Sequence, residues 1–180
     1  MDESATLTPA VSEDDHSEGP ANAPVTLVEY GDYQCPACGA AYPLVKKLQK
    51  AFSKELRFVF RNFPLTQLHP YALAAAETAE AAALQGKFWE MHDLLFERQE
   101  SLEPGILAGW AREVGLDLEK FRAALEQGEI EKRIKKDRSG GIRSGVNGTP
   151  TFFINGVRYD ESRDYDTIRD VLKRLIEESK

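Results

Sequence analysis

The sequence predicts an α/β fold that is interrupted by a set of helices, and three observations support this prediction. Residues 24–63 read as strand, helix and strand, residues 70–143 carry helical patterns, and residues 151–175 read as two short strands followed by a helix. A chain of 180 residues suits a single domain and leaves room for an insertion.

The first half of the α/β pattern has a clear strand-to-helix corner. Residues 24–30, PVTLVEY, form a β-branched and aromatic run that stops at Gly31-Asp32. Pro36 then stands where the first turn of a helix is expected, and apolar residues follow at helical spacing to about residue 52. Residues 56–63, LRFVFRNF, alternate like a second strand.

The helical stretch and the last three elements carry their own boundary signals. Asp117 is expected to cap one helix, and the helix of residues 130–139 is expected to end at Gly140-Gly141. Asn155-Gly156 predicts a tight hairpin turn between two strands. Asp164 or Asp166 should then cap the final helix.

Charge and hydropathy exclude some classes of partner. The net charge is −7, and residues 1–22 are acidic, with no Lys or Arg, so they read as a flexible arm. An acidic surface argues against nucleic acid, and no apolar stretch is long enough to insert into a membrane. Without a secretory signal the chain as written is expected in the cytoplasm, or in the periplasm or cell envelope if a signal was trimmed.

Both cysteines of the chain, Cys35 and Cys38, lie at the strand-to-helix corner in the segment Cys-Pro-Ala-Cys. Cys35 would stand just before a helix N-terminus, where free N–H groups and the helix dipole favour an anion. In such motifs the thiol pKa falls from about 8.5 into a range of about 3.5–7.5. The corner therefore favours a redox pair, in which Cys38 lies one helical turn away and can resolve a mixed disulfide.

Three other interpretations of the pair remain open at this point. A structural disulfide that closes so short a loop would stabilise the fold little. A zinc site needs four ligands, and the chain offers only His16, His69 and His92 besides the cysteines, with no paired spacing. Chance is the last alternative, and the surrounding β-α-β pattern makes redox chemistry the preferred interpretation.

The corner, the helical stretch and the segment Gly148-Thr-Pro-Thr-Phe-Phe-Ile-Asn-Gly156 together resemble the DsbA-like branch of the thioredoxin superfamily over residues 23–180. The resemblance implies a thioredoxin fold of residues 23–66 and 144–180 with an inserted all-helical domain of residues 67–143. It also implies a cis peptide bond between Thr149 and Pro150, facing the cysteines. Pro36, Thr149 and Pro150 would then bind an extended substrate peptide.

The resemblance assigns a role to Glu29 and shows one departure from the family. A buried acid near this point assists proton transfer at the resolving cysteine, so Glu29 is expected to do so, against the alternative of a surface-facing strand residue. The strongly oxidising relatives carry His just before the second cysteine, where this chain has Ala37. We therefore expect a reduction potential in the reducing half of roughly −120 to −270 mV.

These observations predict a protein thiol–disulfide oxidoreductase in which Cys35 and Cys38 are catalytic and no dissociable cofactor or metal is needed. Its partners would be protein thiols and disulfides and a redox-recycling partner of unknown identity. The alternative function is a peptide-binding or chaperone module on the same fold, with an idle cysteine pair. The sequence does not indicate the direction of electron flow.

Overall fold

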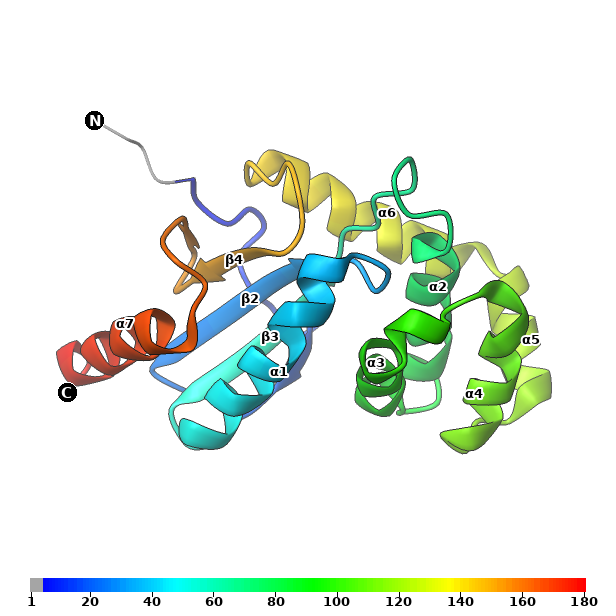
Figure 1. Cartoon of the computed structure of the whole chain (residues 1–180), viewed down its shortest axis with the longest axis horizontal. Coiled ribbons are helices and arrows are strands. Elements are labelled where there is room, and N and C mark those ends of the chain that lie inside the picture. The colour runs from blue at the N-terminus through cyan, green and yellow to red at the C-terminus, as the bar shows by residue number, and fades with distance from the viewer. Residues whose placement is uncertain (1–4) are drawn as a thin grey trace.

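The computed structural model describes residues 5–180 and is built on one mixed five-stranded sheet with the strand order β1-β3-β2-β4-β5 (Figure 1). The strands are β1 (His16–Glu18), β2 (Val25–Gly31), β3 (Leu56–Asn62), β4 (Thr151–Ile154) and β5 (Val157–Tyr159). Only β2 and β3 pair in parallel, through the crossover helix α1 (Pro36–Ala51). The remaining neighbours pair antiparallel, so this sheet with its inserted helices confirms the predicted fold class.

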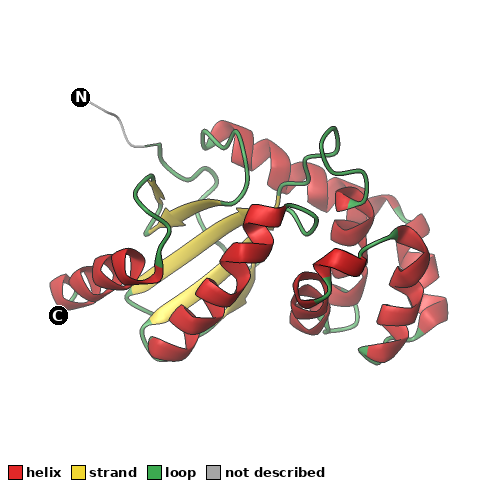
Figure 2. Ribbon diagram, in the orientation of Figure 1, coloured by secondary structure: helices red, strands yellow, loops and turns green. Residues whose placement is uncertain are grey.

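Helices cover the sheet and also extend beyond one end of it (Figure 2). The final helix α7 (Tyr165–Glu178) packs beside α1. Between β3 and β4 the chain forms α2 (Ala72–Ala83), α3 (Phe88–Glu97), α4 (Leu107–Glu113), α5 (Leu118–Glu126) and α6 (Gly128–Arg143), with the short 3-10 helices η1 (Gln99–Ser101) and η2 (Pro104–Ile106). No helix within residues 5–180 combines the length and apolar character needed to cross a membrane.

The sheet buries a different set of side chains on each face. The larger core joins Leu27, Phe58 and Phe60 to α1, α7 and the helices of the inserted stretch. The smaller core lies on the opposite face and contains Val28 and Tyr30. Because strand side chains alternate between faces, Glu29 points to the same face as Leu27, toward the larger core and α1.

Several local signals of the sequence are confirmed. The side chain of Asp117 accepts a hydrogen bond from the Lys120 amide at the start of α5, and that of Asp164 accepts one from the Thr167 amide at the start of α7. Asn155 and Gly156 have φ angles of 49° and 83° in the turn between β4 and β5. Two successive positive φ angles define the type I′ turn that the Asn-Gly pair favours.

The predicted end of the helix at Gly140-Gly141 is wrong, because α6 continues through both glycines to Arg143. A Cβ atom on Gly141 would lie 2.7 Å from the Phe63 ring and 3.0 Å from the Tyr30 ring, and one on Gly140 would lie 3.0 Å from Pro9. Gly141 therefore allows α6 to approach the sheet closely, Gly140 allows it to approach the segment around Pro9, and packing outweighs their low helix propensity.

The expectation of a flexible arm over residues 1–22 is also wrong where the structure describes it; residues 1–4 lie outside the described residues. Residues 5–18, here called the N-terminal strap, cross one face of the sheet and pair with both sides of it. At one end the Leu7 amide donates to the Gly156 carbonyl, and at the other β1 pairs with β3.

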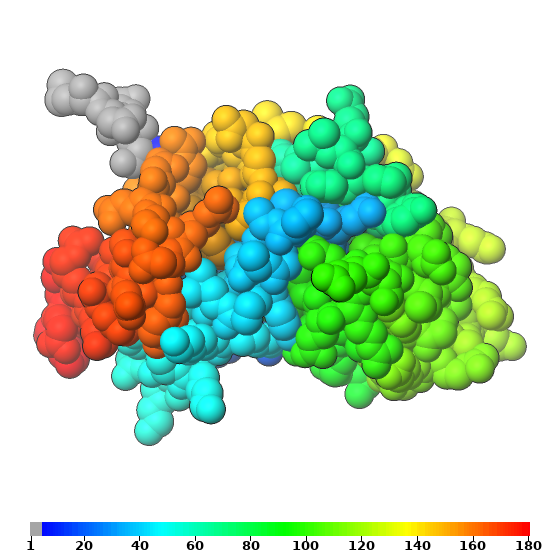
Figure 3. Space-filling view, viewed as in Figure 1, coloured from blue at the N-terminus to red at the C-terminus, as the bar shows by residue number. Residues whose placement is uncertain are grey.

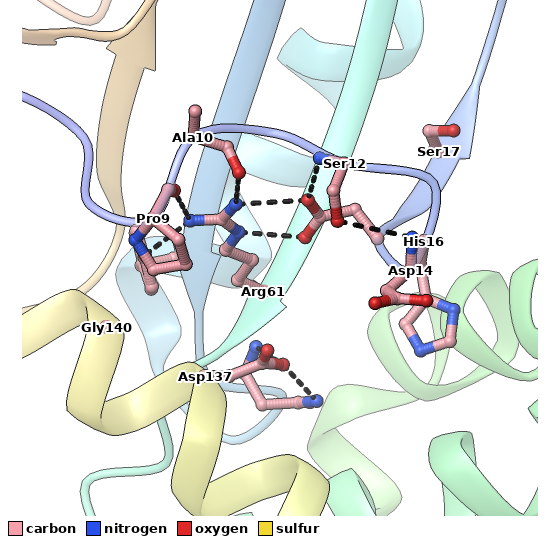
Figure 4. A network of polar contacts seen from close by, with 12 residues as sticks. Pro9, Ala10, Ser12, Asp14, His16, Ser17, Arg61, Asp137 and Gly140 are labelled. Carbon is pink, nitrogen blue, oxygen red and sulfur yellow. Dashed lines mark hydrogen bonds and ion pairs between the residues drawn. The ribbon is translucent and has the colours of Figure 1, made fainter.

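The strap is held by a buried cation that the sequence pattern did not reveal (Figure 4). Arg61 of β3 donates to both carboxylate oxygens of Asp15, at 2.8 and 3.0 Å, and to the carbonyl oxygens of Pro9 and Ala10. It also donates to the Tyr30 hydroxyl at 2.9 Å. Charge pairing and backbone hydrogen bonds thus order a segment that is poor in apolar residues.

Candidate active site

The two cysteines lie where β2 turns into α1, and this connecting segment reaches the surface between the last strands and the helices that follow β3 (Figure 3). Cys35 is the N-cap residue of α1, and Pro36 occupies the first turn, as the sequence predicts. The cap has no side-chain hydrogen bond, and the first turn contains no acidic residue. The amide groups of this turn are therefore available to an anion at Cys35.

Cys35 has the electrostatic surroundings of a nucleophile. A hydrogen bond from the Cys38 thiol, together with others from the Thr149 side chain and the Ala37 and Cys38 amides, outweighs partial burial and lowers the Cys35 pKa to about 5. A thiol with this pKa is mostly ionised at neutral pH. Cys35 retains 6% exposure, so the residue lies at the edge of the core.

Cys38 has the opposite character. It is fully buried in the larger core, and burial, the hydrogen bond it donates to Cys35 and the nearby Glu29 all raise its pKa. Both cysteines are free thiols in this structure. The pair therefore combines one sulfur of lowered pKa at the edge of the core with one fully buried sulfur of raised pKa.

Glu29 is buried with 2% exposure, so the alternative of a surface-facing strand residue is wrong. Its cross-strand neighbours are Phe60 and Phe152, and its Oε1 atom is buried without a hydrogen-bond partner among the described residues. Burial, and to a smaller extent the charge on Cys35, raises its pKa to about 8. A Cβ atom on Gly31 would approach Glu29 Oε1 to 3.1 Å, so the glycine leaves room for the carboxyl group.

Thr149 and Pro150 face the cysteines from the loop that precedes β4. The peptide bond between them is cis, and the Cys35 thiol donates to the Thr149 carbonyl oxygen at 3.5 Å. The Thr149 hydroxyl is buried and has no hydrogen-bond partner in the described chain. Its proton is therefore available to the ionised form of Cys35.

The buried side chain of Asp32, where the first predicted strand stops, holds the cysteine corner in place. One of its oxygens accepts hydrogen bonds from the Gln34 and Cys35 amides, at 2.8 and 3.2 Å. The other accepts from the Leu65 amide at 2.9 Å and lies 2.7 Å from His69 Nδ1. This buried carboxylate therefore connects the cysteine corner to the loop that follows β3.

Two grooves flank Pro150 and could hold a peptide. One, of about 470 Å³, lies along the Thr149 loop and β5, and the other, of about 510 Å³, lies between α1 and α7. The second groove is lined by Ala37, Ala40, Ala41, Pro43, Leu44, Lys47, Pro150, Arg163 and Tyr165. Within residues 5–180, no cluster of three or more His, Cys, Asp and Glu side chains is placed to hold a metal ion.

The structure thus brings Cys35, Cys38, Glu29, Pro36 and the Thr149-Pro150 loop to one corner. Sequence reasoning missed the contribution of Gln99, whose amide contacts this corner from η1. A glutamine 64 positions from Cys35 carries no local signal that could have linked it to the cysteines.

Comparison with known families and structures agrees with this geometry. A family model described as Thioredoxin matches residues 11–174, and the chain belongs to that family. Among solved structures, oxidised BdbD from Bacillus subtilis superposes with a TM-score of 0.84 and 26% identity, covering 97% of this chain and 98% of its own. A thioredoxin-like oxidoreductase from Silicibacter pomeroyi superposes with a TM-score of 0.79 and 28% identity, covering 92% of this chain and 94% of its own. Wolbachia pipientis alpha-DsbA1, at 0.84, is only 20% identical over 95% of both chains and supports the fold alone.

The curated relatives are longer proteins. The chain is 48% identical over 162 residues to Na(+)/H(+) antiporter NhaA 1 of Salinispora arenicola, which covers 90% of this chain and 25% of that protein. It is 41% identical over 165 residues to Na(+)/H(+) antiporter NhaA of Herminiimonas arsenicoxydans, and the match covers 92% of this chain and 26% of that protein. The chain therefore spans about a quarter of the length of the curated relatives it matches.

Proposed function

We propose that this chain is a thiol–disulfide oxidoreductase that exchanges disulfides with protein substrates through Cys35 and Cys38. The observation that carries the proposal is the contrast between the two sulfurs, because the Cys35 pKa is lowered to about 5 while that of buried Cys38 is raised. Thiol–disulfide exchange needs one thiolate to attack and one thiol held in reserve. The family membership and the oxidoreductases among the structural neighbours support the same reaction class.

The reaction proceeds in two exchanges. The Cys35 thiolate attacks one sulfur of a substrate disulfide, so a Cys35–substrate bond forms and the other substrate sulfur leaves as a thiolate. Cys38 then loses its proton and attacks Cys35 Sγ, which releases the second substrate thiolate and leaves a Cys35–Cys38 disulfide. Two electrons pass from the cysteine pair to the substrate, and the reverse sequence oxidises a substrate dithiol.

We assign the proton transfer at Cys38 to Glu29. Cys38 cannot ionise easily in the core, so a base beside it must accept its proton during the second exchange. Burial raises the pKa of Glu29 to about 8, which lets the group gain or lose a proton near neutral pH. Pro36, Thr149 and Pro150 form the proposed peptide site, which is supported by the contact between Cys35 and the Thr149 carbonyl oxygen.

Single and double cysteine variants test the proposal. Cys35→Ser should abolish the reduction of a disulfide-bonded model peptide, whereas Cys38→Ser should accumulate a mixed disulfide between Cys35 and the peptide, visible by mass spectrometry. If the double variant Cys35→Ala, Cys38→Ala retains full activity in a holdase assay and the native chain exchanges no disulfides, the chain is a peptide-binding module instead.

The partners and compartment stay predictions. The substrates would be protein thiols and disulfides, and the recycling partner is unidentified. A location in the cytoplasm, or in the periplasm or cell envelope, stays a prediction. Sodium–proton exchange is not proposed for this chain, because it matches only about a quarter of the antiporters' length and the thioredoxin model covers residues 11–174. We also propose residues 67–143 as an inserted helical domain beside a thioredoxin-fold domain of residues 23–66 and 144–180.

A further inference from the structure

A single side chain from the helical stretch holds the peptide groups around Cys35. Gln99, the first residue of η1, donates from Nε2 to the carbonyl oxygen of Tyr33 at 2.9 Å and to that of Cys35 at 2.8 Å. The Cys35 carbonyl also accepts the Gly39 amide at 3.0 Å, the hydrogen bond that opens α1. One amide group therefore bridges the last turn before the helix and the first turn within it.

Gly39 provides the space that this amide occupies. A Cβ atom on Gly39 would lie 2.2 Å from Gln99 Oε1 and 2.8 Å from its Cδ. Glycine inside a helix costs roughly 1 kcal/mol relative to alanine. A glycine in the first turns of the cysteine helix is thus explained by the Gln99 side chain that packs against it.

We propose that Gln99 is a positioning residue for the exchange reaction, which fixes the peptide groups on both sides of Cys35 and thereby sets the reactivity of its sulfur. The inference rests on the proposed function and extends it to the helical stretch, since η1 follows α3. Carbonyl oxygens are the negative ends of peptide dipoles, so a donor on each offsets the negative potential beside the thiolate. The same hydrogen bonds hold the Ala37 and Cys38 amides in the orientation that stabilises the thiolate.

A structural role in joining the helices to the sheet is the alternative, and the chain offers a matched control for it. Gln85 also makes two amide hydrogen bonds to backbone groups: it donates to the Asp117 carbonyl at 3.1 Å and accepts from the Asp117 amide at 2.9 Å. These bonds lie within the helical stretch and involve none of the groups that surround Cys35. Loss of either glutamine should lower stability, but only loss of Gln99 should change the thiol.

The test compares Gln99→Ala, Gly39→Ala, the double variant and Gln85→Ala in the full chain. The rate of alkylation of Cys35 by iodoacetamide is measured from pH 3 to 9, and Cys38 and Glu29 are left unchanged in every variant. Gln99→Ala removes both hydrogen bonds and should raise the pH of half-maximal rate by about 0.5 to 1, a change equivalent to roughly 1 kcal/mol. Gln85→Ala should leave this pH unchanged while lowering the melting temperature.

Gly39→Ala supplies the decisive comparison, because its methyl group would displace the Gln99 amide. Alone it should raise the half-maximal pH as Gln99→Ala does, but in the Gln99→Ala background it should add nothing, since the methyl group then has space. The proposal would be overturned if the effects of Gly39→Ala and Gln99→Ala on the half-maximal pH were fully additive in the double variant. It would also be overturned if Gln99→Ala left the half-maximal pH unchanged. If a variant does not fold, Gln99→Met keeps the volume without the donor and must give the same upward movement.

The alkylation profile measures the pH dependence of Cys35 reactivity without any protein substrate. Its outcome can therefore be judged independently of whether the chain exchanges disulfides. A native chain that fails to exchange disulfides contradicts the proposed function, whatever the profile shows. A native chain that exchanges disulfides, with a profile insensitive to Gln99, contradicts this inference alone.

Discussion

The Cys35 thiol lies 3.5 Å from the carbonyl oxygen of Thr149, a residue 114 positions further along the chain. The contact places the proposed nucleophile directly against the loop that leads into β4. In the protonated state the thiol donates to this carbonyl. When the thiol ionises, the carbonyl can no longer accept from it, and the buried Thr149 hydroxyl is the group that can donate to the sulfur instead.

We therefore predict that Thr149→Val raises the pKa of Cys35 by about one, the effect of losing a charge-assisted hydrogen bond. The measurement is a pH titration of thiolate absorbance near 240 nm. Thr151→Val is the matched control, because the Thr151 hydroxyl donates to the Gly148 carbonyl at 2.7 Å on the other side of Pro150. Equal titration curves for the native chain and Thr149→Val would show that the hydroxyl plays no part.

Glu29→Gln should stabilise the reduced protein at neutral pH. An unfolded glutamate ionises above about 4.5, whereas the folded Glu29 keeps its proton until about pH 8, so folding holds a proton that the unfolded chain has lost. The contribution of Glu29 to the free energy of unfolding is therefore fully present below pH 4.5 and is lost as the pH rises toward 8. Glutamine avoids that loss, so the variant should gain about 3 kcal/mol at pH 7.

Urea unfolding of the reduced chain at pH 7 and at pH 4 measures this effect. The gain should be present at pH 7 and close to zero at pH 4, while the exposed Glu126→Gln should change neither value. The same Glu29 variant should slow the second exchange, in which Cys38 must lose its proton. A variant as fast as the native chain at every pH would remove Glu29 from the proposed mechanism.

Ala37→His should make the cysteine pair more oxidising. Ala37 is exposed between the two cysteines, so an imidazolium there would stabilise the Cys35 thiolate by charge. The native chain is expected in the reducing half of roughly −120 to −270 mV, and the variant should move tens of millivolts toward the oxidising end. Equilibration with glutathione redox buffers gives both potentials. A native potential near the oxidising end would contradict the role given to Ala37.

The buried ion pair of the N-terminal strap predicts a stability effect far from the cysteines. Burial opposes ionisation of Asp15, but its hydrogen bonds with Arg61 prevail and hold the pKa below its usual value. The contribution of Asp15 is therefore present above its unfolded pKa of 3.8 and is lost as the pH falls. Asp15→Asn should cost about 3 kcal/mol at pH 7, because it leaves the Arg61 charge buried and unpaired.

Thermal and urea unfolding of Asp15→Asn and of the neighbouring Asp14→Asn provide the comparison. Asp14 is exposed, and its substitution should change stability by less than about 0.5 kcal/mol. Equal stability of the two variants would mean that the strap does not depend on Arg61. The alkylation profile of Cys35 should be the same in both.

The parts of the fold that the sequence predicted are those with local causes. Pro36 at the first turn of α1, the Asp117 cap and the Asn155-Gly156 turn each act through neighbouring residues, so a short segment suffices to recognise them. The strand pattern of residues 24–30 and 56–63 likewise reflects burial on both faces of a central pair.

The parts that the sequence did not predict depend on contacts between distant segments. The strap is held by Arg61, 46 positions from Asp15. The glycine pair of α6 is explained by Tyr30 and Phe63 for Gly141 and by Pro9 of the strap for Gly140. At the site, the sequence could not decide between a buried and an exposed Glu29, because one acid within an apolar run fits either face. Its register against Phe60 and Phe152 decides the question.

The central claim is that Cys35 is ionised at neutral pH and Cys38 is not, and the pH dependence of iodoacetamide alkylation of the reduced native chain tests it most directly. Mass spectrometry should show modification of Cys35 alone, with a half-maximal rate near pH 5. Half-maximal modification near pH 8.5, the value of an ordinary thiol, or equal modification of both cysteines, would contradict the account.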